Sequence, residues 1–418
     1  MTLPETDLLS NIVSRYFRIA EVTLGDSRQG YFVRYRGELL LDPAEAYAQL
    51  ADALRPHRIT PLFRLEDGRQ TIRLLHGLVQ PKPGNPAVNI LMFALTVVSV
   101  LFAGAMYSYS GPLPEDIPGQ LWAFVTHLWT GWPFAVSLLG ILLAHEFGHY
   151  FAGRRSGAAV SLPYFIPFPV SILGTMGAFI QLKELPRSKR ALFDLAIAGP
   201  LSGLAVAIPV LVLGLALSDL TTTQNTYYTR AAGQMEACRN SADIGDSYSC
   251  PDDDLLEGNS PLYLGLKYLV KGELLPSPLS YDVPVPLYWL RYLFTGKPVP
   301  VGGQDVLLHP VAMAGWAGLL VTFLNLVPAG QLDGGHILFA VFGRRVRRAW
   351  VVILGFTLLL GFFWNGWWLW SALIFLLGRT QAEPLDQITE LDPRRKALAA
   401  LMLLVFLLVL TPVPFVTF

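Results

Sequence analysis

Long apolar runs alternate with short polar segments along most of this 418-residue chain. A helix that crosses a bilayer needs about 20 mostly apolar residues. The apolar runs lie at residues 87–109, 132–153, 195–217, 310–328, 349–378 and 397–413. The run at 349–378 is broken by "FWNGWW", which suggests a hairpin with aromatic anchors at the membrane interface. The pattern predicts a mostly α-helical, multi-pass integral membrane protein of about six transmembrane helices.

Residues 1–82 follow a different pattern and predict a small α+β domain. "GYFVRYRGELLL" alternates as a strand does, and "DPAEAYAQLADALRPH" combines an Asp N-cap, a Pro at the first helical position and a helical apolar stripe. "TPLFRLED" and "QTIRLLHGL" flank Gly68 and predict a hairpin, which gives the order β-α-β-β. No apolar core follows a basic start, so we expect the N-terminus to stay in the cytoplasm.

Basic residues cluster in four places, at Arg154 and Arg155 and within 183–190, 344–348 and 393–396. Because positive loops face the cytoplasm, the predicted spans place every cluster on the cytoplasmic side, in the cell or inner membrane. The division is then a membrane core over 83–217, an extracytoplasmic loop or cap over 218–308, and a second membrane core over 309–418. Cys238 and Cys250 fall in the cap, where an oxidising compartment favours a disulfide over free thiols.

Composition agrees with a membrane protein. Hydrophobic residues make up 53% of the chain and charged residues 15%, whereas soluble domains carry about 25% charged residues. The formal net charge is zero, which gives no support to nucleic-acid binding.

The span at 132–153 contains "HEFGH", with His145 and His149 four residues apart. On a helix both imidazoles lie on one face and can reach one metal ion. Glu146 projects beside them, as the general base does in the H-E-x-x-H zinc motif. Ionisable residues inside an apolar span are costly and indicate function, so a chance match is the weaker interpretation.

A catalytic zinc ion commonly takes three protein ligands, so a further ligand is expected from another span. "NLVPAGQLDGGH" supplies Asp333 at the inner end of the fourth span, where Pro328 and three glycines break the helix. Broken helix is tolerated at membrane depth where it lines a wet cavity. His336 is a weaker candidate, as a spare ligand or as a group that supports a ligand. His149 lies five residues before Arg154 and Asp333 eleven residues before Arg344, so we expect both at a similar depth, within the membrane near the cytoplasmic face.

These motifs resemble the site-2 protease family of intramembrane zinc metalloproteases. The resemblance rests on HEFGH and on Asn325, Pro328, Asp333 and Gly334, and it extends through residues 163–204 and 309–336. These stretches are most similar to the branch that includes the plant chloroplast EGY-type proteins. The resemblance implies a Zn²⁺ cofactor held by His145, His149 and Asp333, substrates that are transmembrane proteins in the lipid bilayer, and a role in regulated intramembrane proteolysis.

The resemblance also implies roles for two further regions. Asn325 would hold the substrate backbone or stabilise the oxyanion, although a hydrogen bond between helices remains an alternative. A short re-entrant β segment would bind an unwound substrate as an added strand. Its residues are Gly174, Thr175, Met176, Gly177, Ala178 and Phe179. The small residues at 198–200 are interpreted as helix-packing positions.

Two other functions use the same residues. A metal transporter could use the ligands as a transit site, but it needs no general base, and the chain shows no internal repeat of the kind many transporters have. An inactive scaffold would not need the intact ligands and Glu146. The substrate and the oligomeric state are not predicted.

Overall fold

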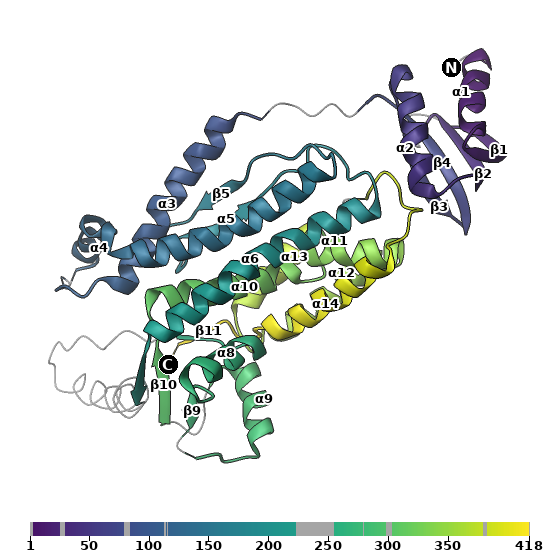
Figure 1. The fold of residues 1–418 in the computed structure, drawn as a ribbon. Coiled ribbons are helices and arrows are strands. Elements are labelled where there is room, and N and C mark those ends of the chain that lie inside the picture. Colours follow the sequence, from purple (N-terminus) through teal and green to yellow (C-terminus); the bar gives the residue numbers. More distant parts are fainter. Residues whose placement is uncertain are drawn as a thin grey trace.

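The computed structural model describes residues 3–25, 30–78, 84–112, 114, 116–222, 255–278, 280–297, 303–378 and 383–417. Figure 1 shows an elongated molecule with a small α/β part at one end, long helices in the middle and a second small group of helices and strands at the other end. Cys238 and Cys250 lie outside the described residues, so their disulfide stays a prediction.

The N-terminal part is an antiparallel sheet with two helices. Its elements are α1 (Leu3–Ser14), β1 (Phe17–Leu24), β2 (Val33–Leu39), α2 (Pro43–Leu54), η1 (Arg55–His57), β3 (Ile59–Glu66) and β4 (Arg69–His76). The strand order is β1-β2-β4-β3. Apolar side chains from both helices and all four strands form one buried core.

Local signals in the sequence account for most of this part. The Asp42 side chain accepts a hydrogen bond from the Ala44 amide, and Pro43 opens α2, as predicted. Asp67 and Gly68 both have positive φ between β3 and β4, which is the geometry of a tight type I′ hairpin turn. The predicted order β-α-β-β lacked α1 and β1, because the mixed polarity of the first 24 residues hides the alternation within Phe17–Leu24.

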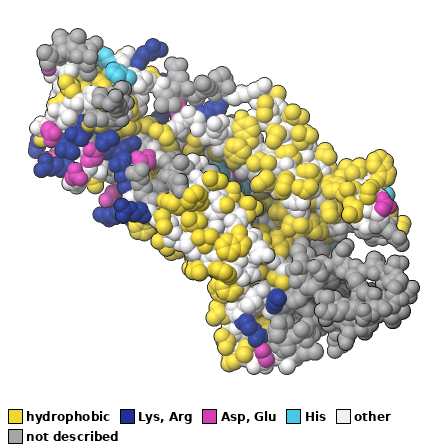
Figure 2. Space-filling view, turned by 180° about the vertical axis from the view of Figure 1, so that it is seen from behind, with side chains coloured by type: hydrophobic (Ala, Val, Ile, Leu, Met, Phe, Trp, Pro, Cys, Tyr) yellow, Lys and Arg dark blue, Asp and Glu magenta, His cyan; other side chains and the backbone are white. Residues whose placement is uncertain are grey.

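Within the described ranges, three helices are long and apolar enough to cross a membrane. They are α3 (Pro86–Ser108), α5 (Trp132–Arg155), which continues the short η2 (Leu128–Gly131), and α6 (Lys189–Leu217). Figure 2 shows hydrophobic side chains over the helical part, with most charged side chains of this view at the N-terminal part and a few at the far end. The chain therefore has the surface of a membrane protein.

The other apolar helices are shorter. They are α10 (Pro310–Leu326), α11 (Asp333–Phe342), α12 (Ala349–Leu360), α13 (Gly366–Leu377) and α14 (Pro393–Val409), with η3 (Gly343–Arg348) before α12. The 17 residues of α10 and of α14 extend about 25 Å, less than the ~30 Å of a hydrocarbon core. The count of six spans therefore stays a prediction. The expected hairpin at 349–378 corresponds to α12 and α13, which pack against each other.

Helices α5, α6 and α10 lie side by side in the middle of the helical part (Figure 1). Glycines allow the close approach. A Cβ at Gly315 of α10 would lie 2.6 Å from the Leu211 Cα of α6, and a Cβ at Gly148 of α5 would lie 2.5 Å from the Ala198 carbonyl oxygen. The Ser202 hydroxyl of α6 also donates to the Ala144 carbonyl of α5. Small residues and hydrogen bonds between helices thus replace the hydrophobic effect, which is weak in lipid.

A two-stranded antiparallel sheet, β5 (Tyr164–Pro167) and β6 (Thr175–Phe179), follows α5. Side chains of α3 hold the backbone of this hairpin. Asn89 donates to the carbonyls of Leu162 and Pro163, and Ser99 donates to the Gly174 carbonyl. The β segment is therefore packed against the helical core rather than exposed as a loop.

The far end of the molecule is a small α/β cap. It contains β7 (Asp219–Thr222), β8 (Leu255–Glu257), α8 (Pro261–Lys271), β9 (Ser277–Pro278), α9 (Val285–Thr295), β10 (Gly303–Leu307) and β11 (Phe415–Thr417). The short α4 (Ile117–Thr126), between α3 and α5 in the chain, packs against α3 instead. The sheets have the orders β7-β10-β9 and β11-β8. The fully buried Lys267 ammonium lies 2.9 Å from Glu257 and 3.9 Å from Asp305, which ties α8 to strands β8 and β10.

Candidate metal centre

Helix α5 carries both predicted imidazole ligands. His145 and His149 are one turn apart and buried, and their Nε2 atoms lie 3.2 Å from each other. The His149 Nδ1 atom lies 2.8 Å from the Leu195 carbonyl oxygen of α6. A carbonyl can only accept, so Nδ1 carries the proton and Nε2 keeps its lone pair for a metal ion.

The predicted helix break lies between α10 and α11, and Asp333 is the first residue of α11. Two glycines allow the chain to turn back here. A Cβ at Gly334 would lie 2.0 Å from the Leu326 carbonyl oxygen, and one at Gly335 would lie 2.5 Å from the Gly330 carbonyl oxygen. The turn therefore needs glycine at both positions, and it directs Asp333 toward α5.

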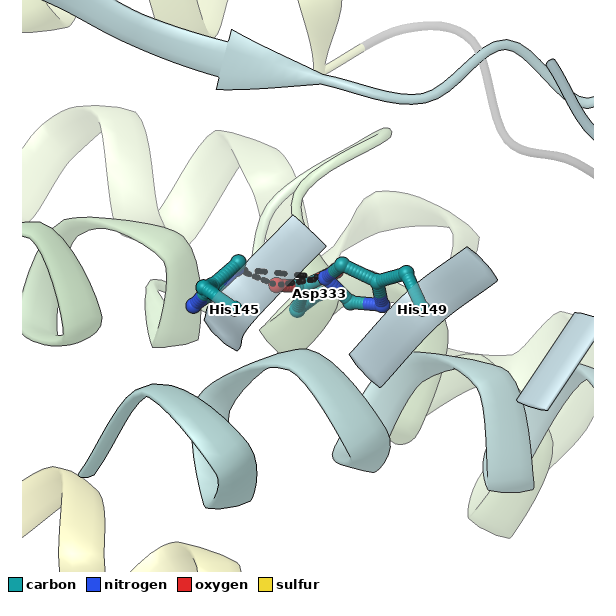
Figure 3. Close-up of side chains that lie close together, drawn as sticks. All are labelled: His145, His149 and Asp333. Atoms are coloured by element: carbon teal, nitrogen blue, oxygen red, sulfur yellow. Dashed lines mark hydrogen bonds and ion pairs between the residues drawn. The ribbon is translucent and has the colours of Figure 1, made fainter. Parts of the chain in front are cut away.

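The three side chains converge from two separate segments, as Figure 3 shows. The Asp333 Oδ2 atom lies 3.4 Å from the His145 Nε2 and 3.2 Å from the His149 Nε2. Two ligand atoms at about 2.0–2.1 Å from a tetrahedral ion lie about 3.3 Å apart. The three observed separations of 3.2, 3.2 and 3.4 Å fit one such ion. Two imidazoles and a carboxylate are also a donor set that suits zinc.

Two more predicted residues lie at this cluster. Glu146 is buried, and its Oε2 atom has no hydrogen-bond partner within the part of the chain that the structure describes. The Asn325 Nδ2 atom, near the end of α10, lies 3.2 Å from the His145 Nε2. A carboxylate oxygen and an amide thus flank the three candidate ligands.

Helix α6 shapes the space for both imidazoles, which the sequence analysis did not foresee. A Cβ at Gly199 would lie 2.0 Å from the His149 Nε2, and a Cβ at Gly203 would lie 3.1 Å from the His145 Nδ1. The four-residue spacing of these glycines matches that of the histidines. A G-x-x-x-G pattern was visible in the sequence, but it indicates close packing without naming what packs there.

A cavity of about 190 Å³ opens onto the cluster. Its walls include Ala178 and Phe179 of the predicted β segment and the two residues that follow at 180 and 182. Thr175 is buried, with its hydroxyl bonded to the Ile166 carbonyl. Positions 174–177 are not among the described residues that line this cavity. The structure thus brings the C-terminal end of the predicted segment and its continuation to the site.

A larger cavity of about 660 Å³ adjoins the first. The two share Phe179, Ile180, Leu182, Gln331 and His336 as lining residues. His336, the weaker ligand candidate, lies on α11 at this junction and outside the group of ligand atoms within 4.8 Å of one another, which comprises His145, His149 and Asp333. The shared lining residues connect the candidate metal centre with the wider opening.

Known proteins share these features. The model of Peptidase family M50 matches residues 133–362, more than half of the chain. Probable zinc metalloprotease EGY1, chloroplastic, of Oryza sativa subsp. japonica is 29% identical over 432 residues, which cover 94% of this chain and 64% of that protein. The Arabidopsis thaliana protein of the same name is 26% identical over 83% of this chain and 58% of its own length. Probable zinc metalloprotease EGY2, chloroplastic, of Oryza sativa subsp. indica is 25% identical over 92% and 62%.

The chain thus spans about three fifths of the length of these relatives. These relatives are named zinc metalloproteases, and zinc is also the metal that the two imidazoles and the carboxylate favour. The resemblance to the site-2 protease family is therefore confirmed. Both the HEFGH helix and the turn at Asp333 fall within the matched residues, and the chain belongs to peptidase family M50, the metalloprotease family of the site-2 proteases.

Proposed function

We propose that this protein is an intramembrane zinc metalloprotease that hydrolyses peptide bonds within or next to transmembrane segments of membrane proteins. The observation that carries the proposal is the convergence of His145, His149 and Asp333, with the three separations expected around one tetrahedral ion. Glu146 lines the same cavity, and its Oε2 atom accepts no hydrogen bond from any residue that the structure describes.

The zinc ion, when bound by these three side chains, acts as a Lewis acid that activates water and polarises the peptide carbonyl. Glu146 then does the proton transfer. Its Oε2 atom takes a proton from the attacking water and returns it to the leaving amine.

Asn325 supports the developing negative charge. Its amide lies within 3.2 Å of a candidate ligand atom, so an N–H of the amide can point at the substrate oxygen beside the metal. A donor aimed at the oxyanion stabilises the transition state more than the ground state.

The β segment supplies the substrate site. A peptide bond in a helix is shielded by its own hydrogen bonds, so a transmembrane substrate must unwind before it is cut. Ala178 and Phe179 at the end of β6 line the metal cavity, and an extended substrate could add to this edge as a strand. We include Gly174, Thr175, Met176 and Gly177 as the part of the segment that positions this edge.

Six membrane-spanning segments and a cytoplasmic N-terminus complete the proposal, with the metal centre near the cytoplasmic face. The positive-inside rule applied to the four basic clusters supports this orientation.

The test uses a reporter with one transmembrane segment between two soluble tags, incubated with the purified full chain in lipid nanodiscs. Wild type should cleave the reporter and hold one zinc ion. Glu146→Gln should retain zinc and lose about 10²–10⁴-fold in rate, and Asp333→Ala should lose zinc. Cleavage by Glu146→Gln at the wild-type rate would overturn the mechanism.

A further inference from the structure

A short segment between α13 and α14 joins the N-terminal sheet to the wall of the cavity. Strand β3 is the edge of that sheet. The Phe63 amide donates to the Leu385 carbonyl at 3.0 Å, and the Gln387 amide donates back to the Phe63 carbonyl at 3.1 Å. This is a parallel β-bridge, so residues 385–387 add a strand-like piece to the sheet.

The other edge of the same piece bonds to the segment before α6. The Leu385 amide donates to the Pro186 carbonyl, and the Asp386 amide donates to the Arg187 carbonyl, both at 2.9 Å. Ser188 and Asp386 form a second parallel bridge. Residues 385–387 therefore lie between two parts of the chain that are far apart in sequence.

Arg64 fixes this junction from the N-terminal side. Its side chain is buried, and one guanidinium nitrogen lies 2.9, 3.0 and 2.7 Å from the carbonyl oxygens of Phe63, Pro384 and Leu385. Burial lowers the pKa of Arg64 to about 10, so it stays charged at neutral pH. Hydrogen bonds from a charged donor are stronger than neutral ones.

Apolar packing and a buried carboxylate support the same contact. Leu385 and Ile388 pack against the core of the N-terminal part. Asp386 is fully buried, and its Oδ1 atom accepts from the amides of Ile388 and Thr389. The segment is thus held in one conformation by its own turn as well as by both neighbours.

The segment ends on the cavity wall. Pro186, whose carbonyl accepts from Leu385, is the last residue of the stretch 179–186 that lines the larger cavity. Phe179, Ile180 and Leu182 of this stretch also line the metal cavity. A displacement at residues 384–387 therefore acts directly on the wall through which the two cavities communicate.

We propose that the N-terminal domain is a latch for the active-site entrance, and that Arg64 is its positioning residue, acting through residues 384–387 on the wall at 179–186. This rests on the proposed function for its effect on substrate. The latch sets how a substrate segment is admitted, while the metal ligands and Glu146 stay in place when it opens.

Hydrogen–deuterium exchange on the full chain in nanodiscs tests the latch without any cleavage. Arg64→Ala should speed exchange of peptides covering both 383–388 and 180–188 by about tenfold, the effect of losing a charge-assisted hydrogen bond. Gln387→Pro removes one amide donor of the latch without changing the N-terminal sequence, and it should act in the same way. Arg18→Ala is the matched control, because this exposed arginine lies on β1 at the opposite edge of the sheet.

The outcomes separate the latch from its alternatives. If 383–388 exchanges faster while 180–188 is unchanged, or if neither region changes, the latch is refuted. If Arg64→Ala also unfolds β1–β4, Gln387→Pro alone decides. Zinc content should stay at the wild-type value in both variants, which shows that the metal centre is intact.

Reporter cleavage adds a readout that follows the proposed function. Both variants should change KM several-fold with a smaller change in kcat, and Arg64→Lys should restore part of the effect because it keeps a charged donor. A wild-type protein that fails to cleave the reporter would refute the proposed function, but the exchange data would still decide the latch. If kcat fell in both variants while KM stayed at the wild-type value, the role of Arg64 in positioning the entrance would be refuted.

Discussion

The space that α6 leaves for the His149 imidazole is the most sharply testable feature of the metal centre. Gly199→Ala adds one methyl group, and its carbon would lie 2.0 Å from the His149 Nε2. Ordinary contact requires about 3.5–4.0 Å, so the ring must move by about 1.5 Å. Metal–ligand distances tolerate about 0.2 Å. His149 would therefore leave the ligand set, and we expect zinc affinity to fall about 100-fold or more.

Competition with a chromophoric zinc chelator measures this affinity on purified protein, without a substrate. Two glycines serve as graded controls. In Gly203→Ala the added Cβ would lie 3.1 Å from the His145 Nδ1, so the ring needs to shift by only a few tenths of an ångström. The zinc affinity of this variant should therefore fall by no more than about tenfold. Gly140→Ala, on α5, has no atom within 4 Å and should bind as wild type does. A Gly199→Ala protein that is folded and binds zinc as tightly as Gly140→Ala would refute the reasoning.

Two further predictions concern the amide at the metal centre and the charge cluster of the cap. Asn325→Ala should lower kcat about 10²–10³-fold with little change in KM or zinc content, because the amide acts on charge that develops in the transition state; an equal rise in KM would indicate ground-state binding instead. Burial raises the pKa of Asp305 to about 7, against the opposing effect of Lys267. A raised folded-state pKa contributes stability below the unfolded value that is lost as pH rises through about 7. Asp305→Asn should therefore raise the protection factors of residues 255–271 at pH 8, which compare the observed exchange rate with the intrinsic rate at the same pH, and should remove most of the pH dependence of these factors. A variant less protected than wild type at pH 8 would contradict this sign.

The group of candidate metal ligands was predictable because its parts are local. A four-residue spacing on a helix places His145 and His149 on one face whatever the tertiary structure is. Asp333 was predictable because proline and glycines mark a helix break inside an apolar run, which is tolerated only where it lines a cavity. The structure adds the distances that bring the two segments together.

Contacts between distant segments were not predictable from the pattern. Gly199 was interpreted as a packing position, and only the crossing of α5 and α6 shows that the packed group is the His149 ring. Residues 384–387 read "PLDQ", with no alternation that would indicate a strand, because their hydrogen bonds go to β3 and to residues 186–187. No local signal in the sequence indicates these contacts, because each contact depends on where a distant segment lies in the fold.

The same distant contacts bear on the topology. Basic clusters lie within 183–190, 344–348 and 393–396. The sequence analysis assigned each cluster to the cytoplasmic side on the basis of its own positive charge. Arg344 lies 2.9 Å from Glu383, and Arg395 lies 2.6 Å from Asp194. A bilayer cannot pass between groups at hydrogen-bonding distance, so these contacts support the proposal that the three segments lie on the same side as the N-terminal part, which the positive-inside rule assigns to the cytoplasm. Helices α12 and α13 must then leave and return on this side. At 12 residues each they extend about 18 Å, compared with ~30 Å of hydrocarbon. Because the hairpin begins and ends on the same side in this topology, the two-sided order of the remaining helices is the same at any depth to which the hairpin enters.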